Sequence, residues 1–114
     1  MPRPQRSRRI CREPEYVAFH AEGGSRENAV LLSLDEYEVL RLVDYEKLTH
    51  EQCAERMDIS RTTVTEICES ARHKLMESLI TGRALYIMGG NVRLCEESRE
   101  GCTCHKNCHC HRQK

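Results

Sequence analysis

The residues best suited to chemistry lie near the end of the chain. Residues 102–111 contain four cysteines and three histidines in ten positions, with the spacing Cys-x-Cys-x3-Cys-x-Cys. A Cys-x-Cys pair can place both sulfurs on one side of an extended segment, and thiolates select soft ions. We therefore expect this segment to bind Zn(II), Cu(I) or an iron–sulfur cluster, with thiol redox sensing and an inert tail as the alternatives. The candidate ligands are Cys102, Cys104, His105, Cys108, His109 and Cys110.

The other four cysteines have different expected roles. Cys53 and Cys68 fall on the apolar faces of predicted helices, where a thiol serves as a small buried hydrophobe. Cys11 and Cys95 could complete a metal shell if the tail folds back. Eight cysteines without a secretory signal indicate cytosolic thiols or metal ligands rather than disulfides, so we expect a cytoplasmic protein. No membrane span is expected, because such a helix needs about 20 apolar residues.

The charges are divided unevenly along a chain that has no net charge. It contains 18 basic and 18 acidic side chains in 114 residues. Residues 1–12 carry five arginines and no acidic residue, whereas residues 33–80 carry eleven acidic and six basic residues. Since the guanidinium group matches phosphate oxygens, residues 1–12 are interpreted either as a phosphate-binding arm or as a solvated terminus. The arginines assigned to DNA contacts of the arm are Arg3, Arg6, Arg8 and Arg9.

The middle of the chain carries the clearest helical pattern. Ser33 and Thr49 each begin a capping-box sequence, and Ser60 can cap a further helix that Gly82 ends. Apolar residues recur at intervals of three or four after each of these caps. The pattern predicts three helices, over residues 34–45, 50–57 and 61–80.

The second and third predicted helices are typical of a helix-turn-helix. They are separated by a tight turn, and a capping serine leads the second of the pair. Ala54 is small where the helices would cross, and Asp58 occupies the turn position that requires positive φ. An ordinary three-helix bundle without DNA binding is the alternative interpretation.

Short apolar segments flank these helices. Residues 16–20 are expected to form a strand or an extended packing segment, and residues 84–95 a β-hairpin around Gly89 and Gly90. A hairpin is marginal alone, so we expect it to cover the apolar underside of the helices. The predicted fold is mainly α, a winged-helix-like three-helix core with a small flanking hairpin and flexible termini. The predicted divisions are a basic arm (1–12), a helix-turn-helix domain (13–95) and a Cys/His-rich tail (96–114).

Two resemblances extend this interpretation. Residues 32–79 resemble the region-4 helix-turn-helix of sigma-70-type factors, and residues 1–95 resemble a bacterial and archaeal family designated domain of unknown function 134. The segments that carry the resemblances are Leu32-Ser-Leu-Asp-Glu-Tyr-Glu-Val-Leu-Arg-Leu42, Ile59-Ser-Arg-Thr-Thr-Val64, Ala71-Arg-His-Lys-Leu75, Met1-Pro-Arg-Pro4, Arg9-Ile-Cys11 and residues 82–94. The resemblance implies a DNA-binding role in transcription. We expect double-stranded DNA as the partner, with a second copy of the chain and RNA polymerase as further candidates.

In a helix-turn-helix the second helix enters the major groove by its N-terminal turns. Arg61 could contact guanine, the threonine methyls suit thymine, and Glu66 could accept a hydrogen bond from cytosine. His50 and Gln52 could hold a phosphate at the start of the preceding helix. The residues assigned to DNA on the helices are His50, Gln52, Arg61, Thr62, Thr63, Thr65, Glu66 and Arg72.

The expected function is therefore a DNA-binding transcriptional regulator with a metal- or redox-responsive tail. Glu66 and Glu69 would repel phosphates, so the basic arm is expected to supply much of the affinity. The alternative is a metal-handling module whose helical core binds a protein partner. No nucleophile–base pair or carboxylate pair stands out, so no enzymatic activity is expected.

Overall fold

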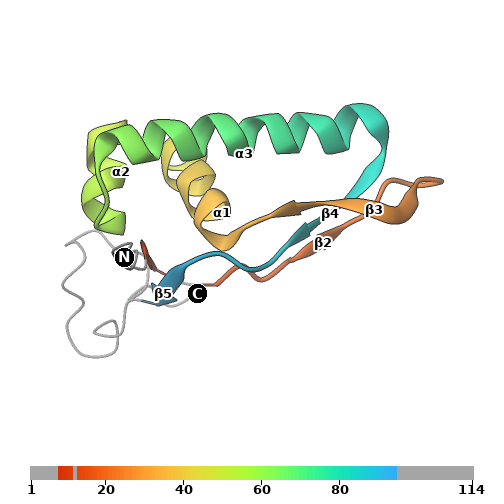
Figure 1. Ribbon diagram of the computed structural model, residues 1–114, viewed down its shortest axis with the longest axis horizontal. Coiled ribbons are helices and arrows are strands. Elements are labelled where there is room, and N and C mark those ends of the chain that lie inside the picture. The colour runs from red at the N-terminus through yellow and green to blue at the C-terminus, as the bar shows by residue number, and fades with distance from the viewer. Residues whose placement is uncertain (1–7, 12, 95–114) are drawn as a thin grey trace, which may run out of the picture.

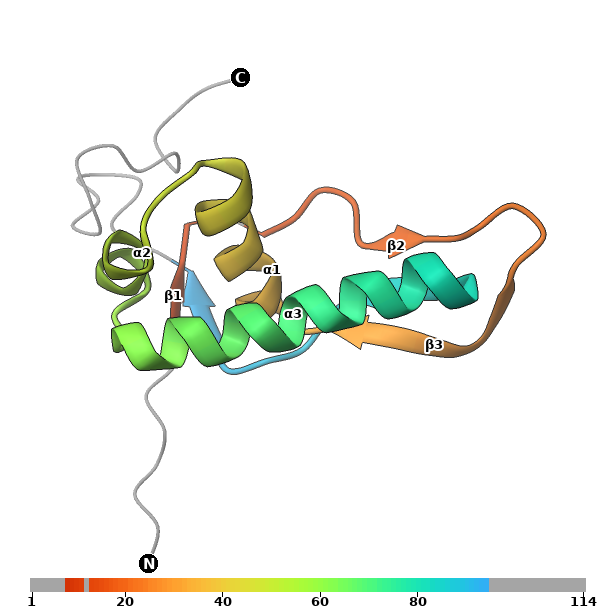
Figure 2. The ribbon, with the colours of Figure 1, turned by 90° about the horizontal axis from the view of Figure 1, so that it is seen from above.

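A computed structural model describes residues 8–11 and 13–94 (Figure 1). About half of these residues are helical, and the long helix α3 lies over a small sheet while α1 and α2 gather at its N-terminal end (Figures 1 and 2). None of the described helices is long and apolar enough to cross a membrane. The elements are β1 (Arg8–Ile10), β2 (Ala18–Phe19), β3 (Ser25–Leu32), α1 (Leu34–Leu40), η1 (Arg41–Tyr45), α2 (His50–Met57), α3 (Arg61–Thr81), β4 (Arg83–Ile87) and β5 (Val92–Leu94).

The helix boundaries follow the local signals in the sequence. Ser33 and Thr49 both form complete capping boxes, in which the cap side chain and the third helical residue each accept a backbone N–H. Ser60 accepts the backbone N–H of Thr63, and Gly82 ends α3 in the left-handed conformation at φ 78°. The three predicted helices are therefore confirmed. The first changes from α to π geometry at η1, and the third extends one residue further than predicted.

The strands form two small sheets rather than a hairpin. In the larger sheet, β4 lies between β2, to which it is antiparallel, and β3, to which it is parallel. In the smaller sheet, β5 pairs in parallel with β1. The prediction of a hairpin over residues 84–95 is therefore wrong, because β4 and β5 do not pair with each other.

The path of the chain after β4 explains why no hairpin forms. Both edges of β4 are occupied, and the Met88 N–H donates to the Leu32 carbonyl, which carries the chain past the end of β3. The Leu34 N–H then donates to the Gly89 carbonyl at 2.9 Å. Gly90, at φ 102°, passes so close to the start of α1 that a Cβ would lie 2.9 Å from the Asp35 Oδ1. These glycines bring the chain across the N-terminus of α1 instead of reversing it.

Two apolar clusters hold the layers together. The first joins β1, η1, α2 and the N-terminal half of α3, and the second joins α3 to the larger sheet. Ile10 of β1 belongs to the first cluster and is almost completely buried. The free arm predicted for residues 1–12 therefore does not include residues 8–10, which form a packed strand. The predicted strand at 16–20 contracts to β2, and β3 was not predicted because its first half is polar.

Leu42→Ala is expected to lower the free energy of unfolding by about 2–5 kcal/mol, because it leaves a cavity in the first cluster. Leu42 is 0% exposed, whereas Leu31 on β3 is 51% exposed. Leu31→Ala removes the same atoms and should cost less than about 1 kcal/mol. Urea unfolding of the full chain, followed by circular dichroism, measures both. Equal losses in the two variants would contradict the placement of η1 at the centre of the core.

Candidate nucleic-acid interface

A tight turn connects α2 to α3 and leaves the first residues of α3 exposed. Asp58 adopts the left-handed conformation (φ 63°, ψ 45°), as the sequence predicts for this position, and Ser60 caps α3 two residues later. Beneath the turn, Cys53 and Met57 of α2 pack with Val64 of α3 in the first cluster. Because these apolar side chains point inward, the opposite face of the first turns of α3 is exposed.

Three of the predicted DNA contacts lie on that face without a partner. Arg61, Thr62 and Glu66 are exposed, and their side chains make no hydrogen bond or ion pair with residues 8–11 or 13–94. An exposed arginine at the first position of a helix is free to bind either a base edge or a phosphate. These three residues therefore remain candidates for contact with a ligand.

The remaining predicted contacts on the helices are used within the fold. The Thr63 hydroxyl lies 2.8 Å from the Ser60 hydroxyl, at the cap of α3. The Gln52 side chain accepts from the Thr49 N–H, and the Gln52 N–H donates to the Thr49 hydroxyl at 3.0 Å. The expectation that the Gln52 N–H is free for a phosphate is therefore wrong, because the capping box satisfies it.

His50 and Thr65 link the two helices. The His50 Nδ1 lies 2.9 Å from the Thr65 Oγ1, which itself donates to the Arg61 carbonyl at 3.2 Å. Since the hydroxyl has one proton, this arrangement assigns the Nδ1 proton to His50. The His50 ring is therefore held against α3 through its Nδ1.

Arg72 is held by an acidic residue of η1. Its guanidinium forms a bidentate pair with Asp44, with the shorter contact at 2.7 Å between the Arg72 Nη2 and the Asp44 Oδ1. This hydrogen bond outweighs the small effect of burial and lowers the pKa of Asp44. The same contact raises the pKa of Arg72. Both side chains are about half exposed, so the pair also screens the charge of Asp44 from a ligand of α3.

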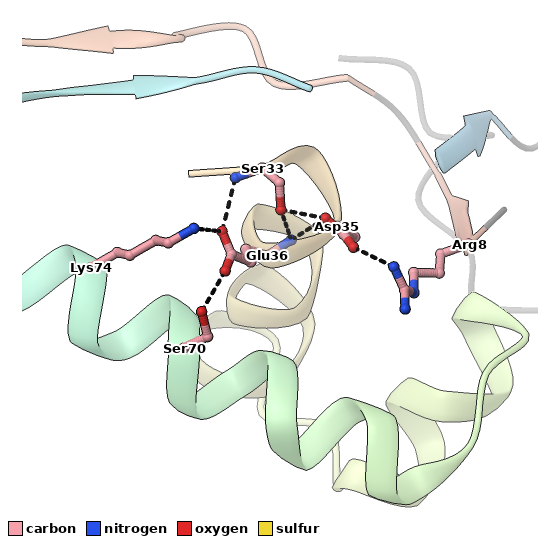
Figure 3. Close-up of polar contacts among 6 residues, drawn as sticks. All are labelled: Arg8, Ser33, Asp35, Glu36, Ser70 and Lys74. Atoms are coloured by element: carbon pink, nitrogen blue, oxygen red, sulfur yellow. Dashed lines mark hydrogen bonds and ion pairs between the residues drawn. The ribbon is translucent and has the colours of Figure 1, made fainter. Parts of the chain in front are cut away.

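Glu36 connects α1 to the middle of α3 (Figure 3). Its carboxylate accepts from the Lys74 Nζ at 2.8 Å, from the Ser70 hydroxyl at 2.7 Å and from the Ser33 N–H at 2.9 Å. Burial would raise the pKa of Glu36, but these hydrogen bonds outweigh burial and hold the pKa below 4.5. The ion pair between Glu36 and Lys74 therefore links α1 to α3.

The arginines of β1 are also engaged. The Arg8 Nη1 lies 2.9 Å from the Asp35 Oδ2 on α1 (Figure 3). The Arg9 guanidinium donates to the carbonyls of Arg56 and Glu55, at 3.0 and 3.3 Å, at the C-terminal end of α2. The assignment of Arg8 and Arg9 to a free arm is corrected, because both secure β1 to helices.

Several predicted residues lie outside the described part of the chain. They are Arg3, Arg6, Cys102, Cys104, His105, Cys108, His109 and Cys110. Among residues 8–11 and 13–94, no group of three or more His, Cys, Asp or Glu side chains is arranged to hold a metal ion. Cys53 is buried as predicted, and burial raises the pKa of its thiol to about 12.

Ion pairs neutralise most of the acidic middle of the chain, which a count of charges along the sequence could not reveal. Seven of the eleven acidic residues in 33–80 form ion pairs with basic residues. The four acidic residues without an ion pair in the described structure are Glu51, Glu55, Glu66 and Glu69. Glu51 and Glu55 border an open depression of about 500 Å³ beside the turn, which Arg61 also lines. The unpaired carboxylates near Arg61 therefore lie on both helices, Glu51 and Glu55 on α2 and Glu66 on α3.

Comparisons with known proteins identify relatives along most of the chain. A family model described as "Protein of unknown function DUF134" matches residues 1–95. A UPF0251 protein of Desulfitobacterium hafniense (strain Y51) is 44% identical over 104 residues, which is 90% of this chain and 83% of the relative. A UPF0251 protein of Chlorobaculum tepidum is 44% identical over 101 residues, 87% of this chain and 51% of the relative. No solved structure gives a significant match.

Glu36→Gln should lower the free energy of unfolding at neutral pH by about 1–3 kcal/mol, because it weakens hydrogen bonds to a charged acceptor. A carboxylate with a depressed pKa stabilises the fold above its unfolded pKa, and this contribution is lost as the pH falls through the folded pKa. The difference between the two proteins should therefore shrink below about pH 4.5, the unfolded value. Urea unfolding at a series of pH values measures it. Glu66→Gln, on an exposed carboxylate of α3, is the control, and an equal loss there would contradict the role of Glu36.

Proposed function

Because this chain belongs to the DUF134 family, we propose a function from its own geometry: it binds double-stranded DNA as a transcriptional regulator. In this proposal α2, the turn and α3 form a helix-turn-helix. The N-terminal turns of α3 enter the major groove, where Arg61, Thr62 and Glu66 face the bases.

The observation that carries the proposal is the contrast between the start of α3 and the rest of the helix. Arg61, Thr62 and Glu66 are exposed, and their side chains make no hydrogen bond or ion pair within the described structure. Further along the helix, Arg72 and Lys74 are committed to Asp44 and Glu36. Polar side chains that have no partner within the fold are available to bind base edges. The apolar residues on the buried side of α3 hold the helix in place.

The pairing of charges answers the main physical objection to this proposal. An acidic region of residues 33–80 would repel DNA, but most of its carboxylates already face a guanidinium or ammonium group. Glu51 and Glu55 remain unpaired beside the turn, as do Glu66 and Glu69 on α3, so these four carboxylates would still repel phosphates. Arg3 and Arg6, outside the described residues, are proposed to contribute sequence-independent phosphate contacts.

Arg61→Ala is expected to weaken binding to a selected DNA sequence by about 1–3 kcal/mol, roughly tenfold to a hundredfold, and to relax the preference at one base position. Arg26→Ala is the matched control. It removes the same charge from the exposed start of β3, at the opposite end of the molecule from the turn (Figure 1). Selection from random duplexes by the purified full chain, followed by titration of the enriched duplex, provides the measurement.

Two results would contradict the proposal. One is that selection enriches no sequence and the chain shows no salt-dependent affinity for duplex DNA. The other is that Arg61→Ala and Arg26→Ala weaken binding equally, since the effect would then reflect net charge rather than the position of Arg61.

The Cys/His-rich tail is proposed to bind a soft metal ion or cluster and to make DNA binding responsive to it. Elemental analysis of the purified chain should find metal that is absent after Cys102, Cys104, Cys108 and Cys110 are all replaced by serine. DNA affinity should then differ between the metal-loaded protein and the chelated protein. Identical affinity in the loaded, chelated and substituted proteins would contradict the coupling.

A second candidate function is supported by the unpaired carboxylates at the turn. Glu51 and Glu55 beside the depression would favour a basic protein partner over a phosphate. In that case the chain is a metal-handling module whose helical core binds a protein. It would contain metal after purification but would not be retained on a DNA column at low salt.

A further inference from the structure

A buried arginine of α2 carries donor groups that no residue of the described fold engages. Arg56 is 5% exposed, and its Nε and Nη1 have no hydrogen-bond acceptor. No carboxylate of residues 8–11 and 13–94 forms an ion pair with it. A buried charge is costly unless it is paired, so a guanidinium in this position is suited to an anion. Such an anion has to come from outside the described residues.

The Arg56 side chain lies in the same part of the core as the Cys53 thiol. Helical side chains lean toward the N-terminus of their own helix, so Arg56 lies over the preceding turn, which contains Cys53. The two groups interact electrostatically, as do Cys53 and the Glu38 carboxylate. Neither neighbour serves as the anion for Arg56. Burial raises the pKa of the Cys53 thiol to about 12, so it stays protonated, and Glu38 is bound to Arg41 at 2.8 Å.

Cys11 brings another thiol to this part of the structure. It follows β1 directly, is 5% exposed, and its N–H donates to the Glu38 Oε2 at 3.2 Å. Two residues earlier, the Arg9 Nε donates to the Arg56 carbonyl at 3.0 Å. Strand β1 therefore lies beside α2 where Arg56 is buried, and Glu38 is a common neighbour of Cys11 and Cys53.

The chain leaves the described structure beside Cys11. Strand β5 ends at Leu94, which is paired with Ile10 in the parallel register of β1 and β5. The next residue is Cys11 on one strand and Cys95 on the other, and Cys95 leads into the Cys/His-rich tail (96–114), outside the described residues. Neighbouring strands are about 4.8 Å apart, so the tail sets out from a point next to Cys11.

The chemistry of thiolate ligands supplies the anion that suits Arg56. Several thiolates around one soft cation carry more negative charge than the ion neutralises, and hydrogen bonds to the sulfurs stabilise that charge. We propose that the Cys/His-rich tail docks at the end of β1, where Cys11 provides one thiolate ligand to the metal ion of the tail and Arg56 balances the charge of this centre. The docking rests on the metal binding proposed above for the tail, and it names the part of the fold that the tail joins.

Other anions suit Arg56 less well. A phosphate of duplex DNA cannot reach a side chain that is 5% exposed. The carboxylates of Glu96 and Glu97, which follow Cys95 in the sequence, would pair with Arg56 whether or not metal is bound. Dependence on metal therefore distinguishes a thiolate centre from a carboxylate partner.

The affinity of the full chain for Zn(II) and for Cu(I), measured without DNA by competition with chromogenic chelators, tests the docking. Cys11→Ala should weaken binding of the ion by more than about tenfold, because it removes a ligand. Cys68→Ala is the matched control, since Cys68 is a buried thiol of α3, and its loss should leave the affinity unchanged. Circular dichroism checks that each variant is folded.

Arg56→Leu separates a role in charge balance from a role in the core. The metal-free variant should be at least as stable to urea as the wild type, because an unpaired buried charge has been replaced by an apolar side chain. The same variant should bind the ion about tenfold to a hundredfold more weakly. A side chain needed only for packing would not give these two opposite effects.

Three results would overturn the docking. If the wild type, Cys11→Ala and Arg56→Leu bind the ion equally well, the tail binds metal without the help of the fold, and the metal binding of the tail stands. If Arg56→Leu lowers the stability of the metal-loaded and chelated proteins equally, the partner of Arg56 is a carboxylate or the side chain is structural. If the wild type binds neither ion, both the docking and an ion bound by the tail are contradicted.

Discussion

Three buried carboxylates on α1 hold the rest of the structure in place. Asp35 pairs with Arg8 of β1, Glu36 binds Lys74 and Ser70 of α3, and Glu38 binds Arg41 of η1 at 2.8 Å. Burying a carboxylate is costly unless it is paired and hydrogen-bonded, so each of these contacts must form when the helix packs. Burial would lower the pKa of Arg41, but Glu38 outweighs burial and raises it. A seven-residue helix thereby fixes a strand, a helix and its own continuation.

These ion pairs hold the core together, and they also determine which side chains remain available at the candidate interface. Because Asp44 and Glu36 engage cations of α3, those cations are not available to phosphates. In the described structure the unengaged polar side chains of α3, Arg61, Thr62, Glu66 and Glu69, lie in its N-terminal half. On the outer side of its other half, the same helix presents apolar residues. One helix therefore carries two different surfaces, one of unengaged polar side chains and one of exposed apolar side chains.

The local features of the fold could be predicted, and the long-range pairing could not. Capping boxes at Ser33 and Thr49, the left-handed turn at Asp58 and the end of α3 at Gly82 depend on neighbours within a few residues. A β4–β5 hairpin was predicted from the same kind of local signal, and this prediction was wrong. Strands β2 and β3 compete for both edges of β4, and a glycine pair suits a close crossing over a helix as well as it suits a hairpin turn.

The sequence by itself determined where the helices begin and end and which faces of them are apolar. Only the tertiary structure decided which charged groups remain free. Arg8, Arg9 and Arg72 look equivalent to Arg61 along the chain, but they bind Asp35, the end of α2 and Asp44. The reason is that a charge acts over distances of a few ångströms in space, between residues 27 to 47 positions apart in the sequence. The neutral total charge therefore does not show which charged side chains can attract a partner. Only the fold shows which of them are paired with one another and which are free.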